Sequence, residues 1–183
     1  MEKIRCSWCE KDDLYRAYHD NEWGKPVYND ETIFEFLVLE SFQAGLSWYT
    51  ILKKRENFKL AFDDFNYRKI AEYTAEKTEE LMQNPGIIRN RLKILATVNN
   101  AKRFLEVQKE FGTFSEYIWS FVNGKPIINN PKTLKDVPAT SEISDALAKD
   151  LKKRGFKFLG STVVYAHMQA TGMVNDHLAD CWE

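Results

Sequence analysis

The stretch DETIFEFLVLESFQAGLSWYTILKKR, residues 30–55, decides the fold. Its apolar residues recur at spacings of three and four, the period of a helix face that packs on a core, and the run around Gly45 interrupts the pattern. The apolar positions are Ile33, Phe34, Leu37, Val38, Leu46, Ile51 and Leu52. The stretch therefore predicts two helices with a break near Gly45.

The rest of the chain repeats this helical pattern. It recurs in residues 67–82, 87–105, 113–121, 141–154 and 161–170. Asn84-Pro85-Gly86 ends the first of these segments, because proline cannot continue a helix. Residues 123–138 hold three of the five prolines and form the only long loop candidate. Sustained alternation of period two is missing, so we expect an all-α fold.

Length and composition favour one domain spanning residues 1–183, since 183 residues of which 44% are hydrophobic can bury one substantial core. The chain has no run of about 18 apolar residues and no apolar signal core, so we expect a cytoplasmic protein without a membrane partner. The formal net charge of -1 excludes a protein that coats nucleic acid by charge alone. Any nucleic-acid site must be local.

Two cysteines and two histidines lie near the two ends of the chain. Cys6 and His19 come early, whereas His177 and Cys181 come late with a spacing that places both on one face if the segment is helical. Two thiolates and two imidazoles suit a closed tetrahedral zinc site, which would fasten the termini together. In the alternative, Cys6 and Cys9 form a C-x2-C metal pair, and spacing alone does not decide between the two. Three cysteines are an odd number, which favours reduced thiols over disulfides.

Aromatic residues and carboxylates gather in a second group. Residues 14–24 are rich in both, Glu40 follows the apolar helical stripe, and Trp48 comes just after the break. Flat rings can stack on a flipped-out base and attract a cationic base by cation–π interaction. A carboxylate beside them can accept hydrogen bonds from the exocyclic amine of the base. The alternative is that Glu40 is a helix-end residue or half of an ion pair and the rings are core residues. We expect His167 to be a satisfied core histidine.

Basic residues form three local clusters, at 53–55, at 89–93 and around the glycines of 152–160. The last two combine cations with tight turns, where backbone N–H groups are also free to bind phosphate. In the alternative, each cluster is a solvated face that balances the acidic residues.

Five runs of the sequence carry a resemblance. They are YHDNEWG (18–24), QAGLSW (43–48), GIIR (86–89), LKKRGFKF (151–158) and VNDH (174–177). Together they resemble the 3-methyladenine DNA glycosylase I family over nearly the whole chain. The resemblance implies the helix-hairpin-helix DNA glycosylase fold, with a cleft between two helical lobes and a structural zinc on Cys6, His19, His177 and Cys181. Cys9 would then be a bystander.

The resemblance also assigns roles in base recognition. It implies that Glu40 recognises the modified base and is the candidate catalytic carboxylate, with Tyr18 and Trp48 stacking and Tyr15 and Trp8 as further walls. It places the DNA-gripping hairpin at residues 151–162, with Lys153, Gly155, Lys157 and Gly160 as its DNA-binding residues. Relatives of this superfamily carry a catalytic Asp where this chain has Asn175, so Asp176 is only a weak substitute.

The implied function is base excision repair. We expect a monomeric glycosylase that flips 3-methyladenine out of double-stranded DNA and releases it hydrolytically as the free base, with N3-methylation itself making the base a good leaving group. Two alternatives stay open. A helix-hairpin-helix DNA-binding module would lack the chemistry, and a zinc hydrolase would need an open coordination position on the metal.

Overall fold

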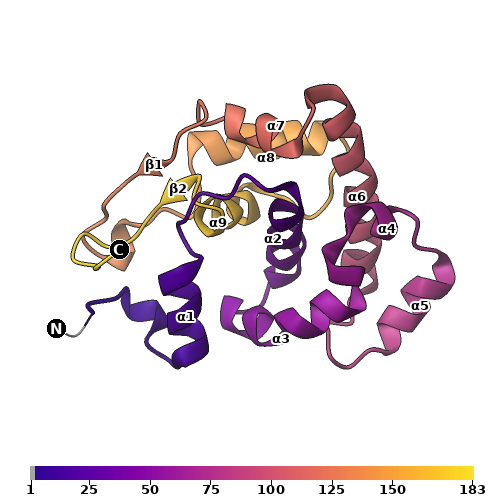
Figure 1. Cartoon of the computed structure of the whole chain (residues 1–183), viewed down its shortest axis with the longest axis horizontal. Coiled ribbons are helices and arrows are strands. Elements are labelled where there is room, and N and C mark those ends of the chain that lie inside the picture. The colour runs from indigo at the N-terminus through magenta and orange to yellow at the C-terminus, as the bar shows by residue number, and fades with distance from the viewer. Residues whose placement is uncertain (1–2) are drawn as a thin grey trace.

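The first helix of the 30–55 stretch crosses the centre of the molecule. In the computed structural model, which describes residues 3–183, α2 (Asp30–Gln43) buries nine residues between Ile33 and Phe42. A helix that is apolar on every side is stable only when other elements cover it, and Figure 1 shows the neighbouring helices around α2. The chain then turns at Gly45, which has a φ of +82°, and continues as α3 (Trp48–Ala61). The predicted pair of helices is confirmed.

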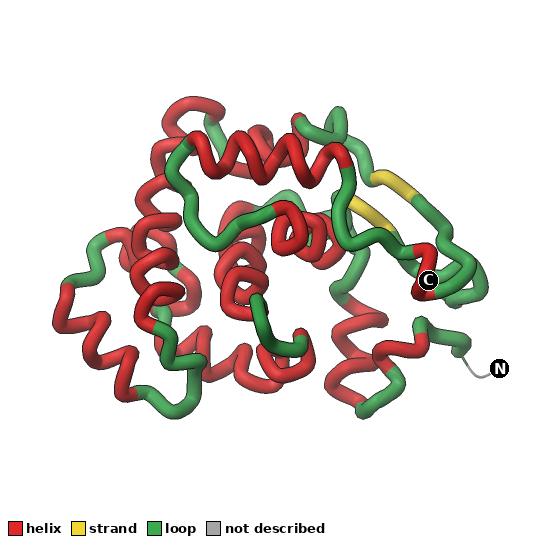
Figure 2. The backbone as a smooth tube through the Cα atoms, turned by 180° about the vertical axis from the view of Figure 1, so that it is seen from behind, coloured by secondary structure: helices red, strands yellow, loops and turns green. Residues whose placement is uncertain are grey.

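Helices make up most of the described chain, as Figure 2 shows. The other helices are α1 (Asp13–Asn21), α4 (Tyr67–Ala71), α5 (Ala75–Gln83), α6 (Arg91–Phe111), α7 (Phe114–Ser120), α8 (Glu142–Lys153) and α9 (Ser161–Ala170). Short 3-10 turns form at η1 (Ser7–Cys9), η2 (Asp63–Phe65) and η3 (Leu134–Asp136). Among residues 3–183, no helix is long and apolar enough to cross a bilayer.

The structure departs from the expected elements in three places. Residues 67–82 form two helices, because the Thr74 side chain accepts from the Lys77 N–H and starts a new helix there. The helix expected from residue 87 begins only at Arg91, where Asn90 caps it. The loop at 123–138 contains β1 (Ile127–Ile128), which pairs in parallel with β2 (Val174–Asn175). The fold is therefore mostly helical, as expected, with one short pair of strands added to the helices.

One large apolar core extends from α2 to β2, with contributions from α3 to α9. A smaller cluster beside it joins Tyr18 of α1, Phe36 of α2, Leu52 of α3 and Ala170 of α9. Tyr18 and Trp48 pack at this smaller cluster, so α1 and the start of α3 meet α9 there. This meeting of elements distant in sequence creates the cavity described below.

The two ends of the described chain lie side by side (Figures 1 and 2). The backbone N–H of Trp182 donates to the carbonyl of Ile4 at 2.9 Å, and the Lys3 ammonium lies 3.4 Å from the centre of the Trp182 ring. The C-terminal segment after β2 is not helical and holds one turn at residues 179–180, so His177 and Cys181 do not lie on a helix face.

Candidate active site and metal centre

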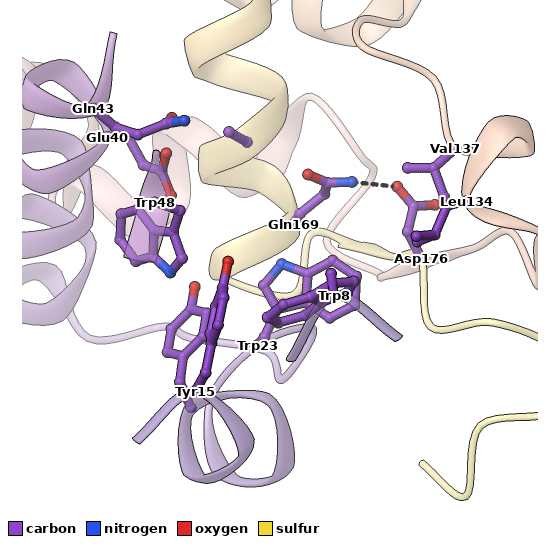
Figure 3. Close-up of a pocket in the computed structure, with 12 residues that line it drawn as sticks. Trp8, Tyr15, Trp23, Glu40, Gln43, Trp48, Leu134, Val137, Gln169 and Asp176 are labelled. Atoms are coloured by element: carbon purple, nitrogen blue, oxygen red, sulfur yellow. Dashed lines mark hydrogen bonds between the residues drawn. The ribbon is translucent and has the colours of Figure 1, made fainter. Parts of the chain in front are cut away.

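A pocket of about 320 Å³ lies where α1, α2, α3 and α9 approach one another. Figure 3 shows side chains from these helices pointing into it. All five residues expected to bind a base line this pocket: Trp8, Tyr15, Tyr18, Glu40 and Trp48. Its other lining residues are Trp23, Gln43, Leu134, Val137, Ala166, Gln169 and Asp176.

Aromatic rings form the walls on the side of α1 and α3. The Trp8 ring centre lies 4.9 Å from that of Tyr15 and 5.0 Å from that of Trp23, in edge-to-face geometry. Tyr18 lies 5.4 Å from Trp48 in a tilted arrangement. Since each ring is held by its neighbours, the walls are preorganised to receive a flat ligand.

Glu40 is the only acidic residue of α2 that is buried, at 3% exposure. Burial away from water raises the pKa of its carboxyl to about 8, and no cation offsets this effect. Within residues 3–183, no group hydrogen-bonds to this carboxyl, which excludes the ion-pair interpretation. A buried carboxyl without a partner is costly, and it becomes favourable when a ligand donates to it.

The same pocket also holds a buried donor without a partner. The indole Nε1 of Trp48 is buried and has no hydrogen-bond partner among the described residues. Trp48 is the first residue of α3, and Ser47 caps that helix by accepting from the Thr50 N–H at 3.2 Å. The pocket thus presents both an unpaired acceptor and an unpaired donor, as expected of a site for a polar, planar molecule.

The opposite wall carries a hydrogen-bonded carboxylate. Asp176 is 1% exposed and accepts from Asn129 Nδ2 at 2.7 Å, from Tyr165 Oη at 2.7 Å and from Gln169 Nε2 at 2.8 Å. Three donors hold its two oxygens, so Asp176 lines the pocket as a hydrogen-bonded carboxylate. The Asn175 side chain accepts from the His177 N–H instead.

Several expected DNA-facing cations are used inside the protein. Arg55 pairs with Glu22 and Glu35 at 2.7 Å each, and its side chain is 18% exposed. The Lys93 ammonium donates to the carbonyls of Phe42 at 2.9 Å and Ala44 at 2.7 Å, at the end of α2. The clusters at 53–55 and 89–93 therefore serve partly to hold helices together.

The turn between α8 and α9, residues 154–160, keeps Lys157 and both glycines exposed. Lys153, Gly155, Lys157 and Gly160 are all on the surface. The side chain of Asn100 on α6 holds the turn from below, because it accepts from the Lys157 N–H and donates to the Lys157 carbonyl, both at 2.9 Å. Arg154 is withdrawn into ion pairs with Glu110 and Asp150.

Cys6, His19, His177 and Cys181 form one group that could hold a metal ion. Their ligand atoms all lie within 4.8 Å of one another. Cys181 Sγ is 3.5 Å from both His19 Nε2 and His177 Nδ1, and Cys6 Sγ is 3.8 Å from His177 Nδ1. A tetrahedral zinc with its usual bond lengths separates sulfur from nitrogen by about 3.5 Å, so the donor set and spacing fit that ion.

The second nitrogen of each imidazole has its own partner, as metal-binding histidines normally do. His19 Nδ1 lies 2.9 Å from Asp20 Oδ1, and His177 Nε2 lies 3.0 Å from the Trp23 carbonyl. The Arg5 guanidinium holds the pKa of the Asp20 carboxyl well below its usual range, so that carboxylate stays ionised beside His19.

Cys9 and His167 both lie outside the candidate metal group. The Cys9 thiol donates to the Cys6 carbonyl at 3.1 Å and lies outside the cluster, so the C-x2-C pair is not formed. His167 is buried, as expected, but both ring nitrogens lack partners among the described residues. It is therefore a core histidine but not a satisfied one, and burial lowers its pKa to about 3.

Gln169 is absent from the site residues predicted from the sequence. Leu134 and Val137 fall in the predicted loop at 123–138 and were not expected at the site either. No local signal marks them, since they reach the pocket only through the packing of α9 and of residues 134–137 against the N-terminal part. Trp23 belongs to the aromatic-rich segment 14–24, but the sequence-based prediction does not include it among the base-binding residues.

The chain is similar to known proteins of one family. The family model described as methyladenine glycosylase matches residues 8–183. A relative from Haemophilus influenzae, named DNA-3-methyladenine glycosylase, is 51% identical over 97% of this chain and 96% of its own. A crystal structure of 3-methyladenine DNA glycosylase I is 49% identical, covers 98% of both chains and has a TM-score of 0.95. A Tyr-to-Phe variant of 3-methyladenine DNA glycosylase I, solved in complex with 3-methyladenine, is 42% identical over 97% of this chain and 96% of that one, with a TM-score of 0.94.

Proposed function

The chain belongs to the methyladenine glycosylase family, and from this premise we propose that it excises 3-methyladenine from alkylated DNA by hydrolysing the N-glycosidic bond. One observation carries the proposal beyond the family: the Glu40 carboxyl is buried without a partner in a pocket walled by aromatic rings. Such a pocket fits a base that is flat, cationic and rich in N–H donors.

Glu40 gives the pocket its preference for a charged base. With a pKa near 8, the carboxyl of the empty pocket is mostly neutral at pH 7. A cationic base placed against it favours the ionised form, so that binding creates an ion pair in a dry site. Normal adenine carries no charge and gains nothing from this pairing. Glu40 therefore recognises the base and selects for a base that carries a positive charge.

The aromatic rings complete the recognition. Tyr18 and Trp48 stack on the base, with Tyr15 and Trp8 as outer walls, and the cationic ring gains from their faces. Because an indole N–H lies in the plane of its ring, the otherwise unpaired Trp48 Nε1 donates to a group at the edge of the ring, such as water, and not to the base that its face covers. Extrusion of the nucleotide from the duplex brings the base into this pocket.

Bond cleavage needs little help from a base catalyst, because a methylated adenine cation leaves as a neutral molecule. Asp176, whose oxygens already accept from three donors, is not the missing catalytic acid of related glycosylases. The pocket contributes by holding the leaving group and by excluding bulk water from its aromatic side.

The surface turn at 154–160 is the proposed grip on the DNA backbone. α8, the turn and α9 form the helix-hairpin-helix of this proposal, with Lys153 and Lys157 facing phosphates and Gly155 and Gly160 allowing close backbone approach. Gly155 has a φ of +89°, which favours glycine at that position.

We also propose that the Cys/His cluster binds a structural zinc ion through Cys6, His19, His177 and Cys181. The ion would supply no chemistry to the reaction, since its four protein ligands complete a tetrahedron and none of them lines the pocket. Its effect is to join residues 6–19 to residues 177–181. This arrangement argues against a zinc hydrolase.

The deciding experiment measures free-base release from methylated duplex DNA by chromatography, with 3-methyladenine and 7-methylguanine quantified together. Selective release of 3-methyladenine by the wild type, with strong loss in Glu40→Gln, supports the proposal. DNA binding without base release would instead indicate the non-catalytic DNA-binding module. Loss of release in a zinc-stripped protein that still binds 3-methyladenine would indicate the metal hydrolase.

A further inference from the structure

Gln169 of α9 stands at the rim of the base pocket. It lines the pocket itself and also an adjoining surface cavity of about 420 Å³, which residues 43–45 border from the other side. Glu40, in contrast, is almost fully buried on the opposite wall (Figure 3). A ligand that reaches Glu40 and extends to the opposite wall therefore has its outer end beside Gln169.

The orientation of the Gln169 amide is fixed. Its Nε2 donates to Asp176 Oδ2 at 2.8 Å. The Asp176 carboxylate also accepts hydrogen bonds from Tyr165 Oη and Asn129 Nδ2. Three donors therefore surround this one acceptor. Turning the amide over would set Oε1 against the carboxylate, which electrostatics forbids. The Oε1 oxygen consequently points into the pocket, as Figure 3 shows.

The shape of a purine nucleotide then places its sugar beside this oxygen. The exocyclic amine and the glycosidic nitrogen lie at opposite ends of adenine. With the amine directed toward the buried Glu40, N9 and the attached C1′ remain near the rim, on the side of Gln169. This placement rests on the proposed function, because it assumes that the pocket holds a flipped 3-methyladenine nucleotide.

We propose that Gln169 is a catalytic residue whose amide oxygen faces C1′ and stabilises the positive charge that develops on the sugar. As the C1′–N9 bond breaks, its electron pair moves to N9, the cationic base becomes neutral 3-methyladenine, and the charge passes to C1′ and O4′. The negative end of the fixed amide dipole lies where this charge appears, and a preorganised dipole stabilises it without reorganisation.

The same oxygen orients the water that completes the reaction. A water molecule donating to Gln169 Oε1 presents its lone pair to C1′, forms the C1′–O bond and releases one proton to solvent water. The products are 3-methyladenine and an abasic site with a hydroxyl at C1′, so atoms and charge balance. Asp176 is a positioning residue in this scheme, because it acts only through the orientation of the Gln169 amide.

The test separates bond cleavage from base binding. Gln169→Met removes the amide but keeps the length of the side chain. Single-turnover release of 3-methyladenine from methylated duplex DNA should slow by about ten- to a hundredfold. The free base lacks the sugar, so its Kd, measured by quenching of tryptophan fluorescence, should stay within about twofold of the wild-type value.

Three results would overturn the inference. They are an unchanged rate of release, a loss of free-base affinity that matches the loss of rate, and loss of 3-methyladenine binding in both Gln169→Met and a parallel Gln169→Leu. A wild type that neither binds nor releases 3-methyladenine would overturn the proposed function itself, which distinguishes the two failures.

Tyr165→Phe is the matched control for the hydrogen-bonded group. It removes another donor to Asp176 but leaves the Gln169–Asp176 hydrogen bond, and Tyr165 does not line the base pocket. Release should then slow by less than about threefold. If Tyr165→Phe slows release as much as Gln169→Met does, loosening of the group explains the effect and the role of the amide oxygen is refuted.

Discussion

The imidazole of His177 lies 3.0 Å from the backbone carbonyl of Trp23 through its Nε2 atom, while its Nδ1 atom faces the two cysteines of the candidate metal group. Trp23 is a wall of the base pocket, and its ring lies 5.0 Å from that of Trp8. The cluster that joins the termini therefore also supports one side of the pocket. Gly24 makes this approach possible, since a Cβ there would lie 2.9 Å from the His177 ring.

The first prediction concerns this support. Cys181→Ala should reduce the zinc content of the purified protein and lower its free energy of unfolding by several kcal/mol, because metal binding is coupled to folding. Since Trp23 loses a fixed neighbour, affinity for free 3-methyladenine should fall as well. Elemental analysis, thermal melting and fluorescence titration measure the three effects.

Cys9→Ala provides the control for that prediction. Cys9 is as buried as Cys6 but lies outside the cluster, so its removal should leave the zinc content unchanged and cost only the lost packing. If Cys9→Ala removed zinc while Cys181→Ala retained it, the assignment of the ligands would be wrong.

The second prediction follows from the pKa of Glu40. Burial raises it from 4.5 to about 8, so between these values the folded state retains a proton that the unfolded state has lost. Stability must then fall as pH rises through this range, by up to about 1.4 kcal/mol for each unit of pKa difference. Glu40→Gln abolishes this loss. The variant should match the wild type near pH 4.5 and melt several degrees higher at pH 8.

Thermal melting at pH 4.5, 6 and 8 tests this trend, with Glu31→Gln as control. Glu31 lies on the same helix but is exposed, so its replacement should shift the melting temperature by a similar amount at every pH. A stability difference between Glu40→Gln and wild type that does not grow with pH would show that the carboxyl is not buried as described.

These residues show what the sequence could predict. The position of Glu40 was predictable, because apolar residues surround it along α2 and a helix with such a pattern must lie inside. The aromatic-rich segment 14–24 already pointed to Tyr15 and Tyr18, whereas Trp8 was assigned to the pocket only through the family resemblance. The candidate metal group followed from residue type, although His177 and Cys181 are brought together by a non-helical segment and not by a helix face.

Other features depend on tertiary contacts that leave no periodic signal. Gln169 looks like an ordinary polar residue until the packing of α9 against the segment after β2 brings it to Asp176. Strands of two residues, such as β1 and β2, are too short to show alternation. Positive charge in a sequence does not reveal whether a cation faces solvent or backbone carbonyls, which is why Lys93 was grouped with surface cations.

The third prediction concerns Lys93. Its ammonium is buried and donates to two carbonyls at the end of α2, the helix that carries Glu40, and to no acidic group. Lys93→Met should lower stability by about 1–3 kcal/mol, since both carbonyls lose a charged donor. The turn that leads to Trp48 should loosen, which weakens 3-methyladenine binding. Lys102→Met, at an exposed site of α6, should change neither quantity measurably.

The fourth prediction separates the DNA grip from the base pocket. Asn100 is 5% exposed and binds both backbone groups of Lys157, so its side chain shapes the turn at 154–160 without facing the surface. Asn100→Ala should weaken binding to a duplex with an abasic-site analogue by about tenfold, because two hydrogen bonds that hold the turn are lost. Free 3-methyladenine binding should be unaffected, since Asn100 does not line the pocket. Fluorescence anisotropy and base titration compare the two affinities, and equal losses in both would contradict a role confined to the turn.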